Sequence, residues 1–184
     1  MISNESTVTN KCRILCNPWL AASVGLFIFV CDFITKRLTY LYLPSETLGH
    51  GNPYPYGGIA IFKNFLGIEF SLVHATNRGA AWGVMADFQH FLLGVRILLV
   101  LVLLAYLFFS KKHPEWRIPM SLIVAGAVGN IIDYFLYGHV VDMFHFVLWG
   151  YDYPVFNVAD SAIFIGIFWL LIASYFDKSE KASV

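Results

Sequence analysis

Charged side chains are scarce in this chain. Only 13% of its 184 residues are Asp, Glu, Lys or Arg, against about 25% in an average soluble domain. A soluble protein with so little charge would expose large apolar patches and aggregate. The 12 basic and 12 acidic residues also cancel, which argues against a nucleic-acid partner, because such partners select for a basic surplus. Disorder is excluded too, since it requires low hydrophobicity and high net charge.

Cysteine is scarce as well, with three residues and no Cys-x-x-Cys pair. This excludes a disulfide framework and the common zinc motifs. One spacing, His139-x-x-Asp142-x-x-His145, leaves a metal site open, because on a helix the three side chains share one side. On a strand the aspartate would point to the opposite face. Gly138 and the aromatic run after it favour irregular backbone, and we predict no metal site.

Long apolar runs are what the sequence has in abundance. Apolar residues make up 58% of the chain, and a helix needs about 20 of them in succession to cross a bilayer. Four segments qualify: residues 19–43, 91–109, 118–137 and 157–176. We therefore predict an all-α integral membrane protein with four transmembrane helices, in one membrane-embedded domain over residues 1–184.

Basic residues outside the spans predict the orientation. Segments on one side carry seven of them, and those on the other side, 44–90 and 138–156, carry only Lys63 and Arg78. By the positive-inside rule both termini are cytoplasmic. The seven are Lys11, Arg13, Lys111, Lys112, Arg117, Lys178 and Lys181.

The outward segment 44–90 is too long for a simple turn. Its Gly/Pro/Tyr-rich stretch 49–58 predicts an irregular loop. Residues 59–62 and 67–74 predict two strands joined by a turn at 63–66, because apolar side chains alternate with others in the second of them. We expect a small β-rich element resting on the outer, periplasmic face of the membrane.

Polar residues gather at the outer ends of the third and fourth spans, where ionisable groups are costly and are candidates for function. Antiparallel helices would bring Asp133 and Asp160 to one depth, with Asp142 on the connection between them. Two carboxylates in contact share a proton, and such a pair can activate water and polarise a peptide carbonyl. Taken singly, each aspartate could instead cap a helix or meet interfacial water. The joint pattern favours a site made of Asn130, Asp133, Asp142, Asn157 and Asp160.

Two further patterns are weaker alone. Asp32 and Lys36 are four residues apart on the first predicted helix and can form an internal ion pair, which could equally serve only to lock helix packing. The segment from Asn77 to Gly83 indicates a turn, in which small residues allow close backbone approach and Asn77 can hydrogen-bond an extended peptide.

Five short motifs follow one another along nearly the whole chain: Asp32-Phe-Ile-Thr-Lys36, Asn77-Arg-Gly-Ala-Ala-Trp82, Gly129-Asn-Ile-Ile-Asp133, Gly138-His-Val-Val-Asp142 and Phe156-Asn-Val-Ala-Asp160. In this order and spacing they resemble the lipoprotein signal peptidase, or signal peptidase II, family. The resemblance implies an aspartic endopeptidase of the bacterial inner membrane whose active site faces the periplasm. Members of the family cleave diacylglyceryl-modified prolipoproteins just before the lipidated Cys.

The resemblance also implies roles for particular residues. The catalytic pair of the family maps onto Asp142 and Asp160. The resemblance implies membrane lipids and prolipoproteins as partners, no nucleic acid, and neither a metal ion nor an organic cofactor. The substrate-binding and supporting residues map onto Asp32, Lys36, Asn77, Gly79, Asn130, Asp133 and Asn157.

Two departures from the family pattern stand out. Tyr134 occupies the position after Asp133 where the family usually has Arg, so that Arg78 or a Tyr hydroxyl must meet whatever the Arg stabilises. The outward segment is also longer than usual, through the stretch 49–58.

Two other functions fit intramembrane acids. A small proton-coupled transporter or channel uses such groups, but transporters often show inverted repeats and midplane sites, and here the acids cluster at one edge. A membrane scaffold would use polar residues only to join helices.

Overall fold

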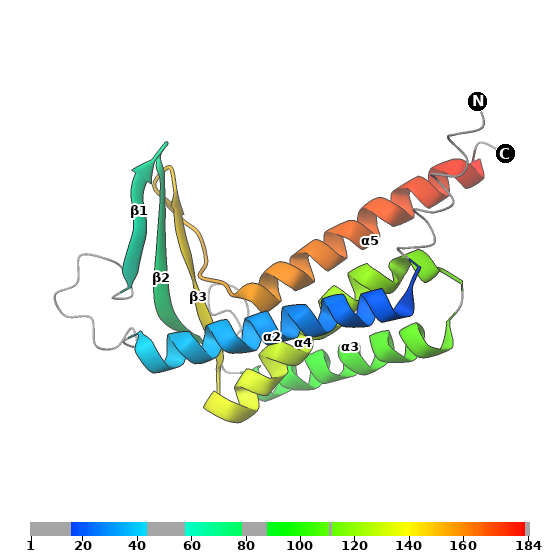
Figure 1. Ribbon diagram of the computed structural model, residues 1–184, viewed down its shortest axis with the longest axis horizontal. Coiled ribbons are helices and arrows are strands. Elements are labelled where there is room, and N and C mark those ends of the chain that lie inside the picture. Colours follow the sequence, from blue (N-terminus) through cyan, green and yellow to red (C-terminus); the bar gives the residue numbers. More distant parts are fainter. Residues whose placement is uncertain (1–15, 44–57, 79–87, 111, 183–184) are drawn as a thin grey trace.

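The computed structural model describes residues 16–43, 58–78, 88–110 and 112–182, with side chains described up to residue 175. Within these ranges four helices are long and apolar enough to cross a membrane, which confirms the predicted spans. They are α2 (Pro18–Tyr42), α3 (Gln89–Phe109), α4 (Arg117–Tyr137), which follows the short 3₁₀ helix η5 (Pro114–Trp116), and α5 (Val158–Ala182). The helices lie side by side, and a small sheet stands at one end of them (Figure 1).

Helix α4 is the centre of the helical part. It packs against α2, α3 and α5, and eleven of its 21 residues are buried, whereas Val100 is the single buried residue of α3. Small residues allow this close packing. A side-chain carbon added at Gly126 would collide with the carbonyl oxygen of Ala159 on α5, and one at Gly166 would collide with α4.

The sheet has four antiparallel strands in the order β1 (Ile59–Phe65), β2 (Ile68–Asn77), β3 (Val140–Leu148) and β4 (Tyr151–Asp152). The predicted small β-rich element is confirmed, and its first two strands match the predicted pair, with the turn at residues 66–67. The expectation of irregular backbone after Gly138 was wrong, because that segment forms β3. Its run of apolar residues shows no alternation, since both faces of its first half are buried.

Helix ends place the polar residues beside the sheet. Gly138 adopts a left-handed conformation (φ +75°) and its N–H donates to the carbonyl of Tyr134 at 2.9 Å, so α4 stops there. Glycine takes this conformation without strain. The chain therefore passes within two residues from α4 into β3. The stretch 49–57 and Gly79 lie outside the described residues.

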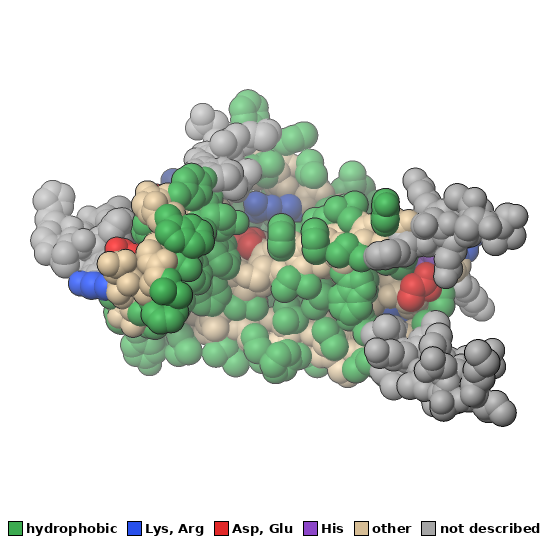
Figure 2. Space-filling model, turned by 90° about the horizontal axis from the view of Figure 1, so that it is seen from above, with side chains coloured by type: hydrophobic (Ala, Val, Ile, Leu, Met, Phe, Trp, Pro, Cys, Tyr) green, Lys and Arg blue, Asp and Glu red, His purple; other side chains and the backbone are tan. Residues whose placement is uncertain are grey.

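Apolar side chains cover the outside of the helices. In the space-filling view, hydrophobic residues dominate the helical surface and charged ones are few (Figure 2). Such a surface suits a hydrocarbon solvent. Exposed examples on the four helices are Leu26, Phe27, Phe33, Leu98, Leu101, Phe135, Phe164, Phe168 and Leu171.

Candidate active site at the junction of helices and sheet

Asp142 lies on β3, where the strand passes the ends of α4 and α5, and only 2% of its surface is exposed. Its Oδ2 accepts a hydrogen bond from Asn77 Nδ2 at 3.0 Å, and its Oδ1 accepts one from Asn157 Nδ2 at 2.6 Å. Asn77 ends β2, and a shift in the β2–β3 register after Leu72 sets Ala75 opposite Asp142. Both oxygens of this buried carboxyl group are thus held by amide groups.

Asp160 lies in the first turn of α5. The side-chain oxygen of Asn157 accepts from the Asp160 N–H at 2.8 Å, and Asp160 Oδ2 accepts from the Asn157 N–H at 3.4 Å. This reciprocal arrangement is a capping box, which satisfies two of the free donors at a helix start. Asn130 Nδ2 of α4 donates to Asp160 Oδ1 at 2.9 Å. Asp160 thus lies at the positive end of the helix dipole and accepts hydrogen bonds from α4 and from the start of α5.

Asn157 joins the two aspartates. Its side-chain nitrogen donates to Asp142 while its side-chain oxygen accepts from Asp160 N–H, and the residue is completely buried. An amide fixed at both ends in this way sets the position of one carboxyl group relative to the other. Asp160 is therefore also a capping residue, since it forms the capping box of α5 with the same Asn157 that donates to Asp142.

The environment of Asp142 favours its neutral form. Burial removes water from the carboxylate, and the negative charge of Asp160 adds repulsion, and together they raise the pKa of Asp142 to about 8. The hydrogen bonds from Asn77 and Asn157 and the charge of Lys36 oppose this shift without reversing it. Asp142 therefore keeps its proton at neutral pH.

Lys36 forms a second cluster deeper among the helices. Its Nζ lies 2.7 Å from Asp32 Oδ2 and 3.0 Å from Asp133 Oδ2, and all three side chains are almost fully buried. The carboxylates also hold backbone groups, since Asp133 accepts from Val141 N–H at 3.1 Å and Asp32 accepts from Ala159 N–H at 2.8 Å. The ion cluster thereby fixes β3 and the start of α5 to α2 and α4.

Asn130 connects this ion cluster to the aspartate pair. Its Oδ1 accepts from Lys36 Nζ at 2.8 Å, and its Nδ2 donates to Asp160. The structure thus places every described residue of the predicted site in one continuous network. The members are Asp32, Lys36, Asn77, Asn130, Asp133, Asp142, Asn157 and Asp160.

The metal alternative does not fit β3. Asp142 points toward Asn77 and Asn157, whereas His145 contacts Ser71 Oγ through Nδ1 (3.2 Å) and Asp152 Oδ1 through Nε2 (2.6 Å). The two side chains thus serve different networks, as alternation along a strand predicts. Among the described residues no group of three potential ligands is placed to hold a metal ion.

The unusual Tyr134 lies away from the aspartate pair. Its hydroxyl is 2.8 Å from Nδ1 of His90, and the two rings meet edge to face. This contact joins the sheet-side end of α4 to the first turn of α3. Arg78, the other group considered at this point, is exposed at the end of β2.

Some site residues were not predicted. The backbone N–H groups of Val141 and Ala159 bind the two carboxylates of the ion cluster, and no sequence pattern announces such a role. Gly129 did have a signal, because it precedes Asn130 directly in its motif. A side-chain carbon at this position would collide with Asp32 Oδ2, so only glycine leaves room for that carboxylate.

Four helices able to cross a membrane, joined to a small sheet with two linked aspartates at the junction, define an integral membrane protein with a polar site where its helices meet the sheet. Residues 24–176 match the family model of signal peptidase (SPase) II. The chain is 35% identical to a lipoprotein signal peptidase of Staphylococcus haemolyticus over 159 residues, which cover 86% of this chain and 92% of that protein. It is likewise 35% identical to one of Chlamydia pneumoniae over 160 residues, 85% and 90% of the two chains.

A solved structure agrees with these sequence matches. A bacterial membrane enzyme determined by the in meso method at 2.3 Å resolution superposes with a TM-score of 0.74 and 28% identity, covering 88% of this chain and 91% of that one. The chain therefore belongs to the signal peptidase II family. It is a multi-pass bacterial membrane protease that removes signal peptides from lipoproteins, and nothing in these matches favours a transporter.

Proposed function

We propose that the chain is an aspartic endopeptidase that cleaves diacylglyceryl-modified prolipoproteins immediately before the lipidated Cys, with Asp142 and Asp160 as its catalytic residues. The observation that carries this proposal is the bridge through Asn157. Its side chain joins the buried carboxyl group of Asp142 on β3 to Asp160 in the first turn of α5. Asp32, Lys36, Asn77, Asn130, Asp133 and Asn157 position the pair.

The environments of the two aspartates support different roles. Asp142, whose raised pKa keeps its proton at neutral pH, donates that proton toward the substrate carbonyl oxygen. Asp160, beside the helix N-terminus, accepts a proton from water as the water oxygen bonds to the carbonyl carbon. The resulting diol then collapses as its C–N bond breaks. Asp160 gives its proton to the leaving nitrogen and Asp142 recovers its own, so the enzyme returns to its starting state.

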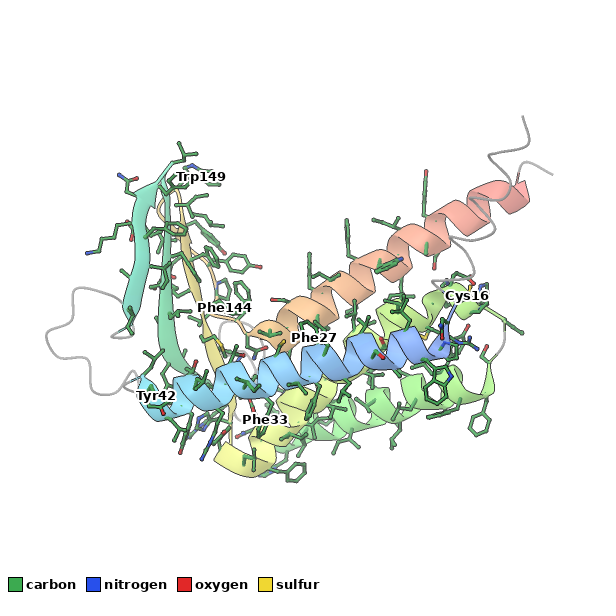
Figure 3. The ribbon with its side chains drawn as sticks, viewed as in Figure 1. Cys16, Phe27, Phe33, Tyr42, Phe144 and Trp149 are labelled. Carbon is green, nitrogen blue, oxygen red and sulfur yellow. The ribbon has the colours of Figure 1, made fainter. Side chains whose placement is uncertain are left out.

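The position of the pair supports a lipid-anchored substrate. The diacylglyceryl group holds the scissile bond close to the membrane surface, which is the depth at which the helices meet the sheet (Figure 1). Aromatic rings form a row from the sheet toward the start of α5, with Phe70 stacked on Phe146 and Phe146 on Phe156. Figure 3 shows Phe144 beside the start of α5 and Trp149 at the far tip of the sheet. An extended peptide can lie along this apolar wall.

Cleavage should depend strongly on the lipid. We expect purified protein to cleave a diacylglyceryl-modified prolipoprotein peptide, and to cleave the same peptide with an unmodified Cys at least about tenfold more slowly, because the acyl chains supply binding energy and place the bond at the site. The comparison is kcat/KM for the two peptides in detergent micelles. Equal rates for both peptides would remove the lipid from the proposal while leaving the peptidase activity intact.

We further propose that both termini are cytoplasmic and that the aspartate pair faces the periplasm, because basic residues concentrate at the opposite ends of the helices. In a background without the native cysteines, Leu66→Cys at the exposed tip of the sheet should react with a membrane-impermeant thiol reagent in intact cells. Glu115→Cys, in η5, should react only after lysis. The reverse pattern of labelling would place the aspartate pair on the cytoplasmic side.

A further inference from the structure

A cavity opens among α2, α3 and α4 at the end of the helices that lies farthest from the sheet. Its volume is about 440 Å³, within the range of sites that hold small molecules. Its lining comes from the first turns of α2 and α4 and the last turns of α3, and it is almost entirely apolar. The aspartate pair lies near the other ends of α4 and α5, so this cavity is not part of the proposed active site.

The packing of the helices explains the cavity. Helices α2 and α3 both pack on α4 but make few contacts with each other. Small residues at the floor leave room for the cavity. A side-chain carbon added at Gly25 of α2 would lie 3.4–3.7 Å from the backbone and side chain of Ser121 on α4. Ala22 and Ala125 add little bulk to the walls.

The depth of the cavity matches one leaflet of a bilayer. The lining on α4 runs from Arg117 to Val128, which at a rise of about 1.5 Å per residue is about 16 Å. Half of the hydrocarbon core is about 15 Å. Stacked rings mark the membrane edge at its mouth, with Trp116 lying against Tyr106 and His113 at centroid distances of 6.2 and 4.2 Å.

The polar mouth of the cavity is cationic. Arg117 lines it, and NH1 of its guanidinium donates to the carbonyl of Cys16 at 2.7 Å. That bond uses one of five N–H donors and holds the group at the edge of the cavity. Exposed Lys112 lies on the connection between α3 and α4, just before Arg117. Glu115, the acidic residue of that connection, lies 3.0 Å from Nδ1 of His113. A cation above an apolar slot one leaflet deep has the two features that an anionic phospholipid requires.

We propose that this cavity binds one anionic phospholipid of the leaflet opposite the sheet, with an acyl chain between α2 and α3 and the phosphate on Arg117. Basic pockets between membrane helices at the cytoplasmic side bind anionic head groups. The bound chain fills the gap between α2 and α3, and so stabilises the attachment of α3, which has few buried residues of its own.

Melting of the delipidated protein in mild detergent tests this proposal. We expect dioleoyl phosphatidylglycerol to raise Tm at concentrations about fivefold lower than dioleoyl phosphatidylcholine, because a basic residue at the surface contributes about 1 kcal/mol toward an anionic lipid. Native mass spectrometry should show one retained phosphatidylglycerol per chain. Inorganic phosphate alone should leave Tm unchanged.

Three variants separate the head group from the chain. Arg117→Gln keeps a donor for Cys16 but removes the charge, and should abolish the preference for phosphatidylglycerol. Ala22→Phe fills the cavity with Arg117 intact, and should weaken retention of both lipids. Arg37→Gln, a matched loss of charge on exposed surface near the other end of α2, should behave as wild type.

Several results would overturn the proposal. These are equal effects of the two lipids on the wild-type protein, stabilisation by inorganic phosphate alone, a preference for phosphatidylglycerol that survives Arg117→Gln, or lipid retention that is unchanged by Ala22→Phe. Recovery of a dimer in place of a lipid-bound monomer would assign the cavity to a second copy of the chain instead.

Discussion

Asp142→Asn and Asp160→Asn are each expected to reduce turnover of a lipidated prolipoprotein peptide by about 10³-fold or more, with the protein still folded. An amide is close in shape to a carboxyl group but cannot exchange the proton that hydrolysis requires. At position 142 it can still accept the bond from Asn157, whose orientation is fixed by Asp160. Steady-state cleavage of the lipidated peptide, with thermal melting as the test of folding, measures the effect.

The double variant provides a sharper check of the same pair. Residues that act as a unit are not additive, so Asp142→Asn combined with Asp160→Asn should be little slower than either single variant. Glu69→Gln is the matched control, because Glu69 is an exposed carboxylate on β2 outside the network. Near-normal cleavage by a folded single variant would rule out the aspartic mechanism.

Lys36→Met is expected to lower the free energy of unfolding by about 3–5 kcal/mol, because it leaves the carboxylates of Asp32 and Asp133 buried without their counter-charge. For a chain of this size the Tm should fall by about 6–20 °C. Thermal melting in detergent measures the loss. Arg37→Met, which removes the neighbouring but exposed cation, should change Tm little.

The origin of that loss can be tested in the same background. Adding Asp32→Asn and Asp133→Asn to Lys36→Met removes the uncompensated charges, and should recover part of the lost stability. A Lys36→Met protein that melts like the wild type would mean that the ion cluster is not needed to hold β3 and α5 in place.

Sequence reasoning was sufficient for features that depend on local pattern. Runs of about 20 apolar residues place the four helices to within two residues at nearly every end, the exception being α5, which continues to Ala182. Charge sufficed to single out the polar cluster that contains Asp142 and Asp160, because polar groups are exceptional among such neighbours. The choice of these two as the catalytic pair came from the family resemblance. The pairing of Asp32 with Lys36 followed from their spacing on one helix.

Features that depend on tertiary contact were beyond that reasoning. Strand β3 was missed because its burial on both faces removes the alternation that identifies a strand. Lys36 was expected to pair with Asp32, yet it also binds Asp133, since α2 and α4 cross at that depth. The bond from Asn77 to Asp142 depends on the register shift between β2 and β3, which no local pattern encodes.

The proposed mechanism requires Asp142 to carry a proton at neutral pH beside the carboxylate of Asp160. Infrared difference spectroscopy of wild type against Asp142→Asn isolates this group, because the other buried carboxyl groups are common to both proteins. The raised pKa of Asp142 predicts a protonated carboxyl band at pH 6–7 that disappears as the pH passes about 8, and cleavage should decline over the same range. A spectrum without such a band at pH 6, together with cleavage that is constant from about pH 7 to 9, would contradict the proposed proton on Asp142.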